Sequence, residues 1–317
     1  MGLIQHFLRQ SQGGLLLAQL PKLVGQFKAH FKGVFAGVDD RAVHRRGLGS
    51  EVVGQVNRRC WVAGHRRGWF GRWRGFGGKT NFNGPGFESY AWAAGIGASV
   101  DRSAVFATSH VPTVHPIMAA KQATVIDHIT NGRFALNIVT GWHRQEIEMF
   151  GIPLREHDDR YDMAAEWLEI IKKLWTEEEE FDYQGKYYNI QKGYLMPKPV
   201  QRPFPAVMNA GGSEKGRHFC AKYCDIAFVG LVSHALEDAK AQIAAYRKLA
   251  REQYGREIQV WTNTYVVQGE TEKDAKDLLR EYIDEKGDWE AAENLVETMG
   301  LNALTFPPEV MQDLKRH

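Results

Sequence analysis

Polar residues recur where short apolar runs of this 317-residue chain end. The run 104-AVFATSHV-111 ends in Thr108, Ser109 and His110, and the run 134-FALNIVTG-141 contains Asn137. An amide inside an apolar strand must find hydrogen-bond partners. Asn137 therefore predicts either a planar ligand that presents a donor and acceptor edge, or a core amide that bonds to the backbone.

A third apolar run, 205-PAVMNAG-211, continues into Gly212 and Ser213 directly before a helix that begins near Glu214. Glycines let the backbone approach a phosphate, and a serine hydroxyl and the free amides of a helix start bind anions. The same turn is also typical of a plain strand-to-helix connection with a serine N-cap. Both interpretations remain open for Ser213.

Arg160 and Tyr161 stand at the opening of another helix, within 155-REHDDRYDMAAEW-167. A cation and a hydroxyl at this position could meet a phosphate or a polyol chain. The alternative is a solvated cluster in which Asp158 or Asp159 is the N-cap.

The histidines of 108-TSHVPTVHP-116 could act as a base, bind a metal or shape a substrate pocket. No carboxylate or cysteine accompanies them at metal-ligand spacing, so we expect no metal site. His110 and Thr108 remain candidates for the pocket. The sequence contains no G-x-S-x-G nucleophile motif, no P-loop and no G-x-G-x-x-G after a strand.

The elements that would position these residues follow a βα pattern from about residue 71 onward. Strands are predicted at 104–111, 134–141, 205–211, 225–231 and 259–267, helices at 116–129 and 159–175, and a hairpin within 181–203. Ligands of parallel α/β folds bind at the carboxyl ends of the strands, so the polar residues should meet there. Five strands are fewer than a closed eight-stranded barrel requires.

Composition divides the chain into residues 1–70 and 71–317. The first part carries eleven Lys/Arg against three acidic residues and no tyrosine, while the second carries 29 against 35. A basic arm for nucleic acid is one interpretation, but these 70 residues lack helical or strand periodicity, so we expect no nucleic-acid partner. With 44% hydrophobic residues and no long apolar run, we expect a cytoplasmic protein without a membrane contact.

Five segments together resemble the bacterial-luciferase-like flavin monooxygenases, nearest to the branch of pyrimidine and alkanesulfonate monooxygenases. The segments are RWRGFGGKTNF, AAKQATVIDHITNGRFALNIVTGW, HDDRYDMAAEWLEIIKKLW, FDYQGKYYNI and NAGGSEKGRHFCAKYCD. The resemblance implies a TIM-type (β/α)8 barrel, incomplete here because its first strands and last strand are not recognisable. Our hypothesis is that residues 1–70 are out of frame or disordered and that the C-terminus is truncated; a genuine N-terminal extension is the alternative.

The resemblance further implies a two-component monooxygenase. Such an enzyme takes reduced FMN from a separate NAD(P)H-dependent flavin reductase and uses O2, through a flavin peroxide, to oxygenate a small molecule, here a pyrimidine-type heterocycle or an organosulfur compound. By position, the cofactor contacts are Gly71, Arg72, Asn137, Glu146, Arg160, Tyr161 and Ser213. We expect no catalytic nucleophile, because the flavin supplies the chemistry.

Three alternatives stay open. One is a deazaflavin-dependent oxidoreductase of the same superfamily, and another is an inactive, frameshifted or truncated fragment. A non-catalytic flavin-binding or nucleic-acid-binding protein is the third. The resemblance also leaves a homo-oligomer open, since dimers are common among such proteins.

Overall fold

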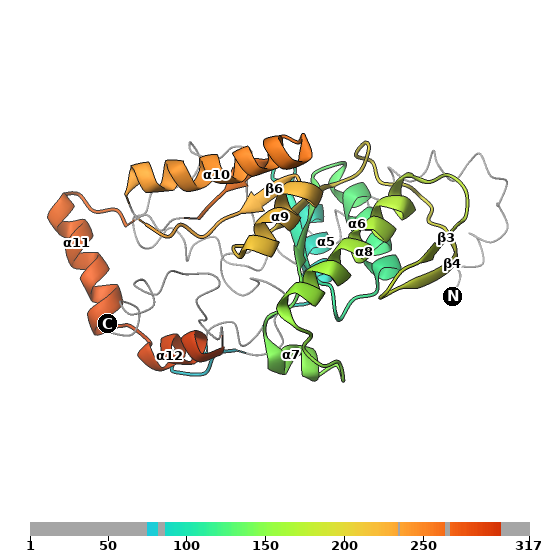
Figure 1. Cartoon of the computed structure of the whole chain (residues 1–317). Helices are drawn as coiled ribbons and strands as arrows, with labels where there is room; N and C mark the ends of the chain where they lie inside the picture. Colours follow the sequence, from blue (N-terminus) through green and yellow to red (C-terminus); the bar gives the residue numbers. More distant parts are fainter. Residues whose placement is uncertain (1–74, 82–85, 234, 264–266, 299–317) are drawn as a thin grey trace.

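A computed structural model describes residues 75–81, 86–233, 235–263 and 267–298. Five parallel strands form one sheet in the order β1-β2-β5-β6-β7 (Figure 1). They are β1 (Val105–His110), β2 (Phe134–Val139), β5 (Ala206–Asn209), β6 (Ile226–Phe228) and β7 (Gln259–Trp261). All five predicted strands are confirmed. The proposed segment 1–70 lies outside the described residues, as do Gly71 and Arg72.

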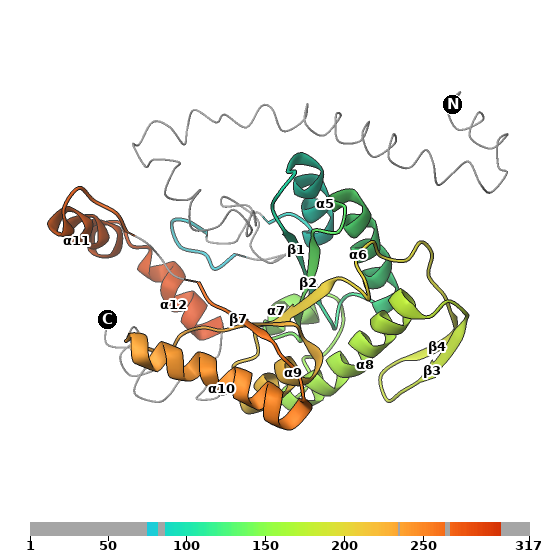
Figure 2. The same cartoon turned by 90° about the horizontal axis from the view of Figure 1, so that it is seen from above.

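Helices cover the outer face of this sheet (Figure 2). They are α5 (Ser89–Ser99), α6 (Pro116–Thr130), α8 (His157–Thr176), α9 (Glu214–Tyr223) and α10 (Leu236–Tyr254). Alternate strand residues such as Ala107, Leu136 and Val207 are fully buried in one core with α6 and α8. This alternation places the intervening residues, including Thr108 and Asn137, on the inner face.

The sheet is curled about its inner face. Phe106 of β1 and Trp261 of β7 belong to the first and last strands of the sheet, yet their ring centroids are 5.6 Å apart in an edge-to-face contact. Side chains of the two outer strands of a flat sheet would be too far apart to touch. The described residues thus form five strands of a barrel wall, as the α/β barrel prediction requires.

The predicted hairpin is confirmed as β3 (Phe181–Gln184) and β4 (Asn189–Gly193), which pair antiparallel. The connector that follows is anchored to α6. There the buried Asp127 carboxylate accepts hydrogen bonds from Gln201, at 3.0 Å from the backbone N and 2.7 Å from Nε2. This anchor fixes the chain where it enters β5.

The glycine-rich segment 75–81 packs against α12 (Trp289–Thr298), which lies beside it in Figure 1. Thr80 N donates to Asp288 Oδ2 at 2.6 Å, although these residues are 208 positions apart. Gly78 has φ +67°, and a Cβ there would lie 2.3 Å from Asp288 Oδ1. The glycines of segment 75–81 therefore allow this segment to lie close to Asp288, far away in the sequence.

Candidate functional site

Thr108 and Asn137 meet on the inner face near the carboxyl ends of β1 and β2. They are direct partners in the strand register, and Asn137 Nδ2 donates to Thr108 Oγ1 at 3.0 Å. His110 ends β1 on the same face, two positions further along. The structure therefore brings together Asn137 and the two residues that the sequence suggested for a pocket.

The other end of the Asn137 amide has no partner among the described residues. Its Oδ1 atom is buried and accepts no hydrogen bond from the described residues. An unpaired buried carbonyl is costly, and such atoms in proteins are usually satisfied by protein, water or ligand. A donor of a bound ligand would satisfy this one.

Asn209 of β5 shows what a structural asparagine looks like in the same sheet. Its Nδ2 donates to Ile138 O at 2.7 Å, and its Oδ1 accepts from Gly211 N at 2.9 Å. Asn209 thus ties β5 to β2 and holds the glycine turn. The contrast supports the ligand interpretation of Asn137 over the core-amide interpretation.

Tyr161 of α8 forms a second polar corner with Ser213 and Thr140. Burial raises the pKa of Tyr161 to about 12, and hydrogen bonds with the Ser213 and Thr140 hydroxyls oppose that rise. The tyrosine hydroxyl also lies over Gly216, where a Cβ would come within 2.6 Å of it. Thr140 and Gly216 were not among the predicted site residues; the only sequence signal for them was their place in the TGW and GGSEKG segments.

Ser213 is the N-cap of α9, and its Oγ accepts a hydrogen bond from Gly216 N at 3.1 Å. Helix capping is therefore confirmed for this serine. The amides of Glu214 and Lys215, in the first turn, have no acceptor within the helix. Together with the Tyr161 hydroxyl they form an arrangement suited to a phosphate.

Arg160 lies beside Tyr161 and holds the loop after β2, since its NH1 donates to Gly141 O. Burial lowers the pKa of the Arg160 guanidinium, and its Nε is buried without a hydrogen-bond partner among the described residues. A half-buried cation whose buried Nε has no partner among the described residues also fits an anionic ligand.

The N-cap expectation for α8 was wrong. The helix begins at His157 after Glu156, and no side chain caps it. Asp159 instead binds Lys186 Nζ at 2.7 Å, Arg155 NH1 at 3.1 Å and the hydroxyl of Tyr187. These partners lower the pKa of the Asp159 carboxyl, with the Lys186 hydrogen bond the largest cause.

Glu146 is buried in the short helix α7 (Arg144–Glu148). His143 caps this helix, accepting from Glu146 N at 3.1 Å through its Nδ1. The His143 ring also packs on Trp142 and Phe76, with centroids 5.4 and 6.3 Å away. This cap therefore joins the loop after β2 to segment 75–81.

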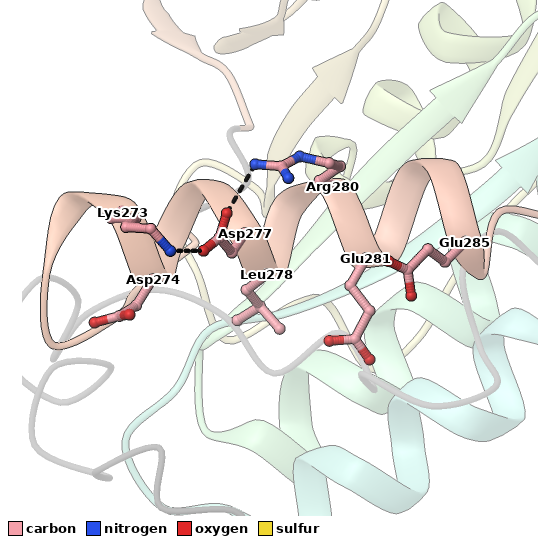
Figure 3. Close-up of a pocket in the computed structure, with 7 residues that line it drawn as sticks. All are labelled: Lys273, Asp274, Asp277, Leu278, Arg280, Glu281 and Glu285. Carbon is pink, nitrogen blue, oxygen red and sulfur yellow. Dashed lines mark hydrogen bonds and ion pairs between the residues drawn. The ribbon is translucent and has the colours of Figure 1, made fainter.

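A hollow of about 680 Å³ lies on the surface of α11 (Glu272–Arg280) and η1 (Glu281–Glu285), away from the strand ends (Figures 1 and 3). Asp277 there is paired with Lys273 Nζ at 2.6 Å and Arg280 NH2 at 2.7 Å. The residues that line it are mostly charged and come from a single helical segment, whereas the predicted site residues gather at the strand ends, so we place the site there. In the part of the chain that the structure describes, no three His, Cys, Asp or Glu side chains gather as metal ligands.

The chain belongs to the luciferase-like monooxygenase family, whose sequence profile matches residues 58–306. The FMNH2-dependent dimethylsulfone monooxygenase of Pseudomonas putida is 34% identical over 168 residues, which are 53% of this chain and 45% of that protein. The pyrimidine monooxygenase RutA of Yersinia enterocolitica is 35% identical over 211 residues, 66% of this chain and 57% of that protein. The chain thus spans about half the length of the curated relatives it matches.

Solved structures agree with this family. A riboflavin lyase with modified FMN and riboflavin superposes with a TM-score of 0.62 at 25% identity, covering 70% of this chain and 54% of that one. EDTA monooxygenase from Chelativorans sp. BNC1 superposes with a TM-score of 0.61 at 25% identity, covering 73% and 61%. The fold is therefore the α/β barrel of this family. No helix in the described ranges is both long and apolar enough to cross a membrane.

Proposed function

We propose that this chain is the oxygenating part of a two-component monooxygenase that binds reduced FMN at the strand ends. The observation that carries the proposal is the buried Oδ1 of Asn137 on the inner face, which accepts no hydrogen bond within the described ranges. A flavin ring offers N–H donors at its edge, and such a donor would satisfy this oxygen. The dimethylsulfone and pyrimidine monooxygenases, each at least 34% identical over the matched regions, support the choice of cofactor.

Tyr161, Arg160 and the start of α9 also have roles in this proposal. Tyr161 and the first turn of α9 after Ser213 would hold the phosphate, and Arg160 would offer its unused Nε to the same anionic group. Bound FMN supplies the oxygen chemistry. The protein positions the cofactor, balances its charge and keeps water from the ring through the apolar inner face.

The proposal includes a separate NAD(P)H-dependent flavin reductase, O2 and a cytoplasmic location. Candidate substrates are a pyrimidine-type heterocycle or an organosulfur compound, in line with the names of the two relatives. The inner face that would meet a substrate carries Phe106, Met208 and Trp261 beside the polar Thr108 and Asn137, a mixture suited to a small molecule with apolar and polar parts.

Turnover with chemically reduced FMN tests the proposal. Uracil and dimethylsulfone are the probes, each incubated with the full chain under 18O2 and under argon. We expect one 18O atom in the product of one probe, and no product under argon. Substrate oxidation under argon with an oxidised deazaflavin in place of FMN would instead indicate hydride transfer from the substrate to the deazaflavin, and would overturn the monooxygenase assignment.

A further inference from the structure

Thr108 is held in place from two sides. Its backbone N donates to Ser89 Oγ at 2.6 Å, at the start of α5, and the register of β1 with β2 sets its side chain beside Asn137. Its hydroxyl oxygen then accepts the amide proton of Asn137 at 3.0 Å. The position of this hydroxyl is therefore determined by the fold and does not depend on a ligand.

This contact decides what Asn137 presents to the inner face. A side-chain amide has a donor end and an acceptor end, and the donor end is engaged by Thr108. The acceptor end, Oδ1, is the atom left buried without a partner among the described residues. A ligand at this point must therefore supply a hydrogen-bond donor.

We propose that Thr108 is a positioning residue for the flavin: its hydroxyl orients the Asn137 amide so that Oδ1 accepts a hydrogen bond from a ring N–H. This inference rests on the proposed FMN site. The ring N3–H is present in both redox states, whereas N5 carries a hydrogen only in reduced FMN and is itself an acceptor in oxidised FMN. With N5–H as the donor to Oδ1, an acceptor held in this orientation favours the reduced form. Thr108 thereby contributes to the selection of the redox state that the oxygen reaction requires.

A purely structural role predicts a different outcome. If Thr108 only packed β1 against β2, valine would replace it with little effect on binding, because the two side chains have nearly the same shape. Serine keeps the hydroxyl but loses a methyl group. The two variants therefore separate hydrogen bonding from packing.

The experiment measures dissociation constants of reduced FMN, anaerobically, and of oxidised FMN for wild type, T108V and T108S. We expect T108V to bind reduced FMN about 3- to 10-fold more weakly, and to lose part of the preference for the reduced form. T108S should stay within about twofold of wild type. Unchanged affinity of T108V for reduced FMN would overturn the inference about Thr108 but not the proposed FMN site. The same holds for an equal loss of affinity for both redox forms in both variants. A wild-type chain that binds neither form would refute the FMN site, and the inference with it.

A second comparison tests whether Thr108 acts through Asn137. In an N137L background the amide is gone, so adding T108V should cause no further loss of affinity for reduced FMN. If T108V weakens binding by the same factor with and without Asn137, Thr108 acts independently and the inference is wrong.

Discussion

At the residue scale, the sheet contains two asparagines with opposite hydrogen-bonding status. Asn209 has both ends of its amide satisfied by neighbouring backbone groups. Asn137 has one end satisfied and the other buried without a partner in the part of the chain that the structure describes. Residue type alone does not distinguish a structural amide from a binding amide, but the completeness of its hydrogen bonds does.

Leucine substitutions at these positions should change stability in opposite directions. N137L removes an unsatisfied buried oxygen, so we expect the ligand-free protein to be equally stable or stabilised by about 1 kcal/mol. N209L leaves Ile138 O and Gly211 N without partners, and should destabilise by about 2–5 kcal/mol. Urea unfolding of both variants without FMN measures the difference. If N137L destabilises as much as N209L, Asn137 is a structural residue.

Tyr161 predicts an alkaline limit of stability. Its pKa is raised by burial to about 12 from the usual value of 10.0. Below pH 10 the hydroxyl is protonated in both the folded and the unfolded chain, so its contribution is fully present. As pH rises from 10 toward 12 only the unfolded chain ionises, and stability falls, by on the order of 2 kcal/mol near pH 12.

Y161F lacks this group and should lose less stability than wild type over the same pH range. Urea unfolding at roughly pH 9 and pH 11 measures the two slopes. Y194F, at a tyrosine with an exposed ring, is the control and should follow wild type. Identical slopes for Y161F and wild type would show that the Tyr161 hydroxyl does not differ between the folded and unfolded states.

At the element scale, the proposed phosphate site lies where α9 begins, close to the turn after β5. The close approach of α9 to this turn determines the shape of the site. A Cβ on Gly211 would lie 2.6 Å from Gly216 Cα, so the turn and the first turn of the helix touch through glycine alone. The Tyr161 hydroxyl closes the same site from α8. The two glycines therefore allow a contact between backbones that no other residue type would permit.

G216A should disturb this site directly. The added methyl group would lie 2.6 Å from the Tyr161 hydroxyl and 2.8 Å from Gly211 Cα, so we expect a loss of about 1–3 kcal/mol in stability and weaker FMN binding. G230A is the matched control, because a Cβ there has no neighbour within 4 Å. Thermal unfolding and FMN titration of both variants give the comparison. Equal stability and equal FMN affinity of G216A and G230A would show that the close approach at Gly216 is not important for the site.

Sequence periodicity predicted the strands and part of the helices, but not the contacts between these elements. Four strands, α6, α8 and the hairpin were predicted within a few residues, because apolar alternation and helix start signals are local. The strand β7 begins at the predicted residue but ends at Trp261 instead of residue 267, and α5 and α10 were not predicted. The Thr108–Asn137 pair depends on the register between strands, and the Asp288–Thr80 contact joins residues 208 positions apart. Neither leaves a local signal. The contact of Asp159 with Lys186 on the hairpin likewise leaves no local signal in the sequence.

At the scale of the whole molecule, a curled sheet with helices on its outer face leaves the inner face for a ligand. Phe106 and Trp261 meet across this face, and the polar residues of β1, β2 and β5 gather toward the carboxyl ends of their strands. The same arrangement relates the chain to the luciferase-like monooxygenases. The central claim is that this edge of the described sheet binds FMN through Asn137.

Anaerobic titration of the full chain with reduced FMN tests that claim most directly. We predict saturable binding of one FMN per chain, and at least about a tenfold loss of affinity in N137L, whose folding the urea experiment will have established independently. Absence of saturable binding in the wild-type chain, or equal affinity in wild type and a folded N137L variant, would contradict the account.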